Sequence, residues 1–265
     1  MRIGPLVTLC ALLAVPAVVH ARGADGDFEQ RRSSHFVLHQ DVAIEDRGGL
    51  RGSRRFEQQV LDELERAYDA LGEWLALRPP RRIDVVVYDP ARFDAAFAGQ
   101  FRFAAAGFYH GVIRVRGDSR LTVGLSRVLH HELVHAALDA AAPNLWLPGW
   151  VNEGTAEWFE ARAAGSRGLG LRERAFLAAL AREGRLPSLS ALAAPSFAGL
   201  DQGAAQVVYL QSYALLDYLA RLEGERSLGD FIAALIQSRS LDRALHRVYR
   251  LDAATLEVRF IEGLD

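Results

Sequence analysis

The chain contains 265 residues, with 31 basic against 33 acidic side chains and a formal net charge of −2. This balance leaves no basic excess to recruit nucleic acid, and no basic patch suited to an anionic membrane surface stands out. The length suits one large domain with a substantial core. Because Cys10 is the only cysteine, an intramolecular disulfide is excluded.

Residues 1–21 have the pattern of a secretory signal peptide. Arg2 provides the positive start, residues 6–19 form an apolar core, and small residues flank His20 at the expected cleavage site. All basic residues are arginine, which together with frequent alanine is typical of a GC-rich bacterial genome. We therefore expect a periplasmic or secreted bacterial protein without a stable membrane anchor after cleavage. Residues 22–32 are polar, and we expect them to be disordered.

Residues 33–142 are predicted to form an α/β lobe. The sequence predicts strands at 34–39 and 83–88, where apolar or β-branched residues dominate, and a strand or hairpin at 107–116. Apolar residues at helical spacing predict a long helix over 54–77, which ends before Pro79-Pro80. A short helix is expected at 92–97 and another at 126–138.

The expected helix over 126–138 carries the motif His131-Glu132-Leu133-Val134-His135. Two histidines four residues apart lie nearly above one another on a helix, so both imidazoles can bind one tetrahedral Zn²⁺. Glu132 follows the first histidine directly, where it can accept a proton from the attacking water. His130 points about 100° away around the helix and is not expected to be a ligand.

A third ligand is expected from Glu153, which lies 18 residues after His135. Two histidines and one glutamate form a standard ligand set for hydrolytic zinc. Glu157 lies one turn further along the same face, where it can bond the outer nitrogen of a liganding histidine. Asp139 is an alternative third ligand, although a solvated position at the end of its helix is the simpler interpretation.

The remainder of the chain, residues 143–265, is predicted to form a helical lobe. Gly, Pro and Ser breaks separate five segments with helical patterns: 151–164, 170–182, 204–222, 227–237 and 239–248. Strands first and helices afterwards predict the α+β class. We expect one domain over 33–265, with a metal site between a mixed sheet lobe and the helical lobe.

The two motifs together resemble those of a known enzyme family. His131-Glu132-x-x-His135 followed by Trp150-x-Asn-Glu153-Gly-x-Ala-Glu157 is similar to the gluzincins, the zinc metallopeptidases that include thermolysin and aminopeptidase N. It looks closest to the peptidase MA-like bacterial family. The resemblance implies a zincin-like fold, zinc ligation by the two histidines and Glu153, and general acid/base catalysis by Glu132.

A second part of the resemblance concerns a tyrosine in the C-terminal part of the chain. The segment Val208 to Leu219 is similar to the aminopeptidase segment whose first tyrosine stabilises the oxyanion, and this role falls to Tyr209. A phenol is a donor near neutral pH and suits a developing alkoxide. Tyr213 lies on the same predicted helix and remains the alternative donor.

The chain departs from the aminopeptidase pattern at one place. Aminopeptidases carry a glutamate that holds the substrate amine on the strand before the zinc helix, and residues 105–112 contain none. The sequence therefore predicts a secreted zinc metallopeptidase that acts on a peptide or protein but is not an aminopeptidase. A zinc-bound peptide-binding or assembly factor, and a zinc hydrolase of esters or epoxides, remain alternatives. Substrate-binding residues and oligomeric state are not predicted.

Overall fold

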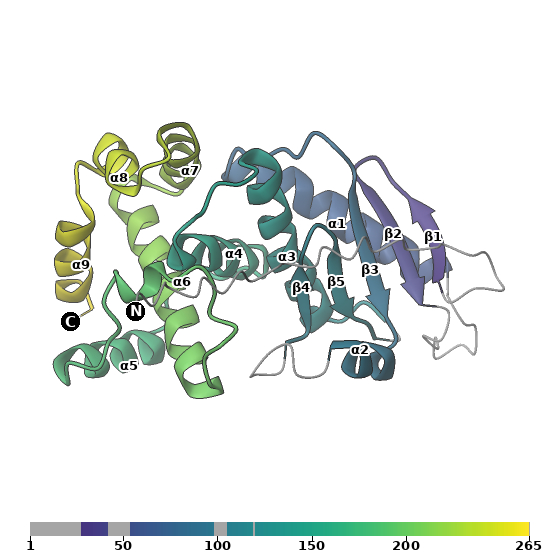
Figure 1. Ribbon diagram of the computed structural model, residues 1–265, viewed down its shortest axis with the longest axis horizontal. Helices are drawn as coiled ribbons and strands as arrows, with labels where there is room; N and C mark the ends of the chain where they lie inside the picture. The colour runs from purple at the N-terminus through teal and green to yellow at the C-terminus, as the bar shows by residue number, and fades with distance from the viewer. Residues whose placement is uncertain (1–27, 42–53, 98–104, 119, 265) are drawn as a thin grey trace, which may run out of the picture.

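A computed structural model describes residues 28–41, 54–97, 105–118 and 120–264, and the expected signal at 1–21 lies outside them. A five-stranded mixed sheet forms one half of the molecule (Figure 1), in the order β1-β2-β3-β5-β4. β2, β3 and β5 are parallel, and β1 and β4 are antiparallel edge strands. The strands are β1 (Phe28–Arg32), β2 (Phe36–Asp41), β3 (Ile83–Tyr88), β4 (Gly107–Tyr109) and β5 (Ile113–Arg116).

β1 corrects the expectation that residues 22–32 are disordered. Residues 28–32 pair antiparallel with β2 in a register that places Arg32 opposite Val37. The ring of Phe28 also meets Tyr88 edge-to-face at a centroid distance of 5.4 Å. Backbone pairing does not depend on side-chain polarity, so a polar segment becomes ordered when a sheet edge is available to it. Residues 22–27 lie outside the described residues.

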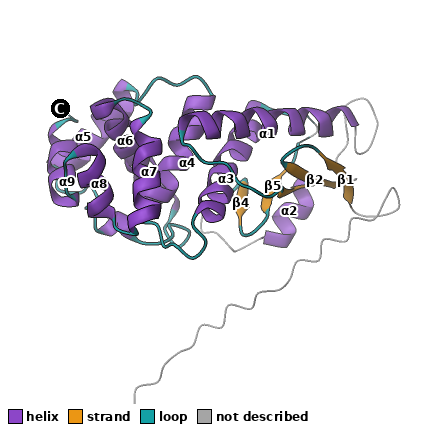
Figure 2. Ribbon diagram, turned by 90° about the horizontal axis from the view of Figure 1, so that it is seen from above, coloured by secondary structure: helices purple, strands orange, loops and turns teal. Residues whose placement is uncertain are grey.

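Two helices lie on opposite faces of the sheet (Figure 2). α1 (Arg54–Trp74) buries the stripe that its sequence spacing predicts, including Val60, Leu64 and Leu71, against alternate apolar residues of the strands. α2 (Pro90–Phe97) places Phe93 on the other face. The amphipathic pattern of the sequence therefore identified the helix that covers the sheet.

The other half of the described molecule is helical. α3 (Val123–Ala141) packs against β4, β5 and α1, and α4 (Gly149–Ala163) packs against α3 on one side and α6 on the other. The remaining helices are α5 (Leu171–Arg182), the short 3₁₀ helix η1 (Ala191–Ala193), α6 (Gln202–Glu223), α7 (Ser227–Ser238), α8 (Leu241–Tyr249) and α9 (Ala253–Glu262).

The α+β class and the order of strands and helices are thus confirmed. α9 was not expected from the sequence. Asp252 caps this helix by accepting a hydrogen bond from the backbone N–H of Thr255. Leu256 and Phe260 are buried on its inner face. None of the described helices combines the length and apolar character that a membrane crossing requires.

Candidate metal centre

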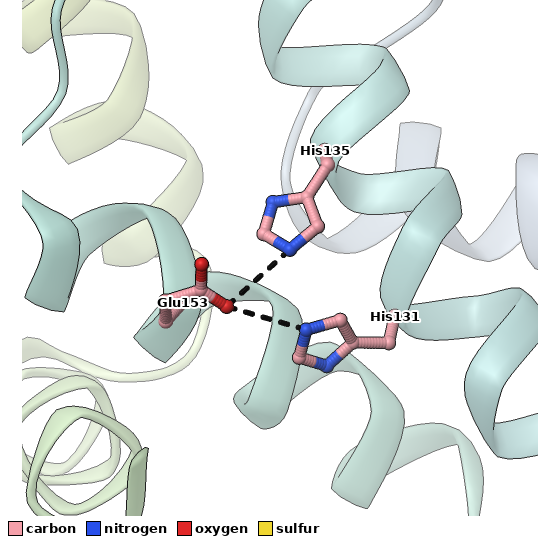
Figure 3. A group of neighbouring side chains, drawn as sticks. All are labelled: His131, His135 and Glu153. Atoms are coloured by element: carbon pink, nitrogen blue, oxygen red, sulfur yellow. Dashed lines mark ion pairs between the residues drawn. The ribbon is translucent and has the colours of Figure 1, made fainter. Parts of the chain in front are cut away.

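Three side chains from α3 and α4 point toward one another (Figure 3). Thr122 caps the start of α3, because its hydroxyl accepts a hydrogen bond from the backbone N–H of Leu125, and the helix continues unbroken through His131 and His135. α4 begins after Pro148 and presents Glu153 from its first turns. The structure therefore brings together the three residues that the sequence predicts as metal ligands.

The spacing of the three ligand atoms fits a tetrahedral ion. The Nε2 atoms of His131 and His135 each lie 3.4 Å from Glu153 Oε2. Ligand atoms about 2.0–2.1 Å from a tetrahedral zinc are about 3.3–3.4 Å apart, so these distances match two edges of such a tetrahedron. Glu153 Oε2 is buried and forms no hydrogen bond within the described residues, which is costly without a cation.

The outer nitrogens of both imidazoles have acceptors that direct Nε2 toward Glu153. His135 Nδ1 lies 3.2 Å from Asn152 Oδ1, and His131 Nδ1 lies 3.2 Å from Glu160 Oε2. With the proton on Nδ1, the lone pair of each Nε2 is available to a metal. Glu157, the partner predicted from sequence, is further away, with Oε1 at 3.7 Å from His131 Nδ1.

Glu160 and Asn152 are site residues that sequence reasoning missed. Glu160 lies seven residues after Glu153, two turns along the same face of α4, so helical spacing could have made it a candidate beside Glu157. His131, Glu157 and Glu160 form a second group with potential ligand atoms close together. However, Arg127 Nε donates a 2.6 Å hydrogen bond to Glu160 Oε1 and already pairs that carboxylate.

The ionisation of the cluster follows from burial and charge. Burial lowers the pKa of His131, but the nearby carboxylates of Glu153 and Glu160 outweigh it and hold the pKa well above its usual value. Burial raises the pKa of Glu153, but the two imidazoles outweigh it and hold the pKa far below its usual range. Burial raises the pKa of Glu157 to about 7 despite the nearby His131. The protein environment therefore strongly favours the charged form of Glu153, the form that binds a cation.

Glu132 lies beside the ligands and lines the same cleft. Its side chain is buried, and burial raises its pKa while His131 and His135 oppose that change. The backbone of Tyr109 in β4 lies near its carboxylate and also opposes the rise in pKa. This contact requires a close approach of β4 to α3, which Gly107 allows, because a Cβ there would lie 2.5 Å from Val128 Cγ1.

The structure separates the two candidate tyrosines of α6. Tyr209 lines the cleft, with its ring centroid 6.5 Å from that of His131. Burial raises the pKa of its phenol well above the usual value, which keeps it a hydrogen-bond donor. Tyr213 lines no part of this cleft, and its hydroxyl lies 3.4 Å from Ser166 Oγ. The geometry therefore brings Tyr209, and not Tyr213, to the candidate ligands.

The cleft itself has a volume of about 380 Å³ and lies between β4, α3, the α3–α4 connection, the segment around Pro195 and α6. Asp139 lines it but does not belong to the converging ligand group, because its Oδ2 accepts a 2.8 Å hydrogen bond from the hydroxyl of Tyr109. His130 faces away from the cleft, with Nε2 2.9 Å from Glu63 Oε1. Glu132, Tyr209 and the three candidate ligands thus face one cavity.

Comparison with known proteins adds no family assignment. No protein-family model and no curated protein matches the chain.

Proposed function

We propose that this protein is a zinc-dependent metallopeptidase of the gluzincin type, with a zincin-like arrangement of its α3 and α4 helices. The observation that carries the proposal is the convergence of two imidazole nitrogens on a buried carboxylate oxygen, each at 3.4 Å, beside a cleft that Glu132 also lines. Two histidines and one glutamate are a set that hydrolytic zinc sites use with one position left open.

The donor set favours zinc over harder cations. Two neutral imidazoles and one carboxylate suit zinc, whereas Mg²⁺ and Ca²⁺ prefer oxygen ligands. Asn152 and Glu160 support the same assignment, because hydrogen bonds to the outer nitrogens are the usual companions of metal-binding histidines. Zn²⁺ bound at these residues would polarise the scissile carbonyl and lower the pKa of water.

The chain's own groups supply the remaining chemistry. Glu132 accepts a proton from the attacking water and returns it to the nitrogen of the leaving amine. Its burial raises its pKa, which suits a group that must both take up and release a proton. Tyr209 donates its phenolic hydrogen to the oxyanion that develops at the carbonyl, a contact worth about 3 kcal/mol by comparison with other oxyanion donors.

A peptide substrate is supported by the position of β4. This strand is at the end of the described sheet, its residues line the cleft, and its partner β5 occupies only one of its two edges. An extended peptide can add to a free strand edge through backbone hydrogen bonds. An ester or an epoxide has no use for such an edge, so the arrangement favours peptide bonds as the substrate.

The test compares the purified protein with its Glu132→Gln variant. Zinc per chain is measured by metal analysis, and cleavage is measured by mass spectrometry on a library of peptides. We expect one zinc in both proteins and cleavage by the parent alone, because glutamine cannot accept the proton. Zinc in both with cleavage by neither would contradict the peptidase and favour a zinc-bound binding factor. Absence of zinc from both would refute the ligand assignment.

A further inference from the structure

We propose that Asp139, Tyr109 and Trp146 form a subsite that binds a cationic group of the substrate, a guanidinium or an ammonium. The three residues line the same cleft as the metal ligands. The inference rests on the proposed peptidase function and adds to it a preference for positively charged substrates next to the reacting bond.

Asp139 has the position that such a subsite requires. It lies four residues after His135 on α3, so its Cα is about 6 Å further along the same helix face. An extended peptide advances about 3.3 Å per residue. A substrate side chain that reaches Asp139 therefore belongs to a residue within about two positions of the scissile bond.

The carboxylate of Asp139 is held in place and still accessible. The Tyr109 hydroxyl donates a 2.8 Å hydrogen bond to Oδ2. Burial and the neighbouring Asp139 raise the pKa of this phenol well above its usual value, so it remains the donor. Asp139 is exposed and, within the described residues, forms no ion pair, which leaves Oδ1 available to a ligand.

Trp146 supplies an aromatic surface in the same cleft. Its side chain is 77% exposed, although it belongs to the α3–α4 connection and lines the cleft together with Leu145 and Leu147. A ligand can cover the exposed ring of a tryptophan in a cavity without displacing other protein contacts. The face of the ring attracts a guanidinium or an ammonium. An aromatic face and a carboxylate in one cleft are suited to an arginine or lysine side chain.

The charges of the cleft also favour a cationic ligand. Its described lining contains three acids, Glu132, Glu153 and Asp139, and no arginine. A divalent cation at the ligands would offset the charges of Glu132 and Glu153, so that Asp139 carries the remaining negative charge. A substrate carboxylate therefore meets no described cation there, which argues against a carboxypeptidase and for a cationic substrate group.

The experiment uses peptides in which a single arginine is scanned along a neutral sequence, each paired with the same peptide carrying citrulline, which has the shape of arginine without its charge. Each peptide is prepared with a free and with an acetylated N-terminus. Binding is measured by fluorescence anisotropy to the zinc-loaded Glu132→Gln protein, and cleavage is measured with the parent. The variants are Asp139→Asn and, as a control that removes one acidic charge from α1 outside the cleft, Glu73→Gln.

We expect arginine peptides to bind about threefold to tenfold more tightly than citrulline peptides when the residue stands next to the scissile bond. Asp139→Asn should abolish this ratio, and Glu73→Gln should leave it unchanged. A preference for the free over the acetylated N-terminus that Asp139→Asn also abolishes would support the subsite with an ammonium as its ligand.

Two results would overturn the subsite. One is equal binding of arginine and citrulline peptides with either N-terminus, and the other is a ratio that persists in Asp139→Asn. Cleavage by the parent without a charge preference would refute the subsite while the peptidase proposal stands. A charge-dependent binding that Asp139→Asn abolishes, without cleavage of any peptide, would support the subsite and refute the peptidase.

Discussion

Replacement of Glu160 by glutamine tests how the candidate metal centre is held. Glu160 Oε2 lies 3.2 Å from His131 Nδ1, and Oε1 accepts a 2.6 Å hydrogen bond from Arg127. The carboxylate orients the imidazole and increases its basicity, so that Nε2 becomes a better ligand. Glutamine keeps the volume and one oxygen acceptor but removes the charge.

We expect Glu160→Gln to weaken zinc binding by about tenfold, the lower end of the range of about ten- to hundredfold for such partners, because the amide oxygen can still accept the Nδ1 proton. A tenfold change in Kd corresponds to about 1.4 kcal/mol. A competition titration against a chromophoric zinc chelator near neutral pH measures the change directly. Thermal unfolding at a fixed zinc excess gives a second reading, because ligand stabilisation depends on the ratio of concentration to Kd.

Glu157→Gln is the matched control, since it makes the same substitution about one turn away on the same helix. Glu157 Oε1 is 3.7 Å from His131 Nδ1, too far for a hydrogen bond, and we expect a clearly smaller loss of zinc affinity. Circular dichroism should show that both variants keep their helices. If Glu157→Gln weakened zinc binding as much as Glu160→Gln or more, the assignment of Glu160 as the partner of His131 would be wrong.

Three further predictions follow from the site. Tyr209→Phe should lower kcat by about a hundredfold with unchanged zinc content. Tyr213→Phe should leave kcat near that of the parent. Equal losses of kcat in the two variants, measured by steady-state kinetics, would refute the role of Tyr209. Zinc affinity should keep rising as the pH increases above 7. The raised pKa of His131 is the reason, because protons then still compete with the metal for this imidazole. Chelator titrations in which the zinc affinity reaches a plateau near pH 6.5 would contradict this prediction. Gly154→Ala should destabilise the protein by about 1–3 kcal/mol in urea denaturation, because its Cβ would lie 2.5 Å from the backbone oxygen of Ser212.

Much of the fold could be predicted because its periodic segments are long. The helical spacing over 54–77 corresponds to α1, the long helix that covers one face of the sheet. The β-branched run at 83–88 corresponds to β3, the central strand of the sheet. The residues His131, His135 and Glu153 could be found for a related reason. Spacing along two helices restricts which side chains can meet, and the structure brings the Nε2 atoms of both histidines within 3.4 Å of one carboxylate oxygen.

The parts that escaped prediction depend on packing between elements. Glu157 and Glu160 share one face of α4, so the sequence does not decide which of them reaches His131; the crossing of α3 and α4 and the pairing with Arg127 do. β1 escaped because four of its five side chains are polar or charged and its order comes from the backbone bonds to β2. α9 is different, since its cap at Asp252 was readable, and the short length of the pattern concealed it.

The close contacts of α4 connect stability to the geometry of the metal ligands. Gly154 faces α6, where a Cβ would meet both Ser212 and Leu216, and its neighbour Glu153 faces α3. A side chain at Gly154 displaces α4 away from α6 and therefore changes the distance between Glu153 and the two histidines. Metal–ligand distances tolerate only about 0.2 Å of deviation, less than the several tenths of an ångström that the Cβ needs. Gly154→Ala should thus weaken zinc binding as well as folding, although residue 154 does not line the cleft. A variant that lost stability with unchanged zinc affinity would show instead that α3 and α4 move together, as one rigid pair, relative to α6.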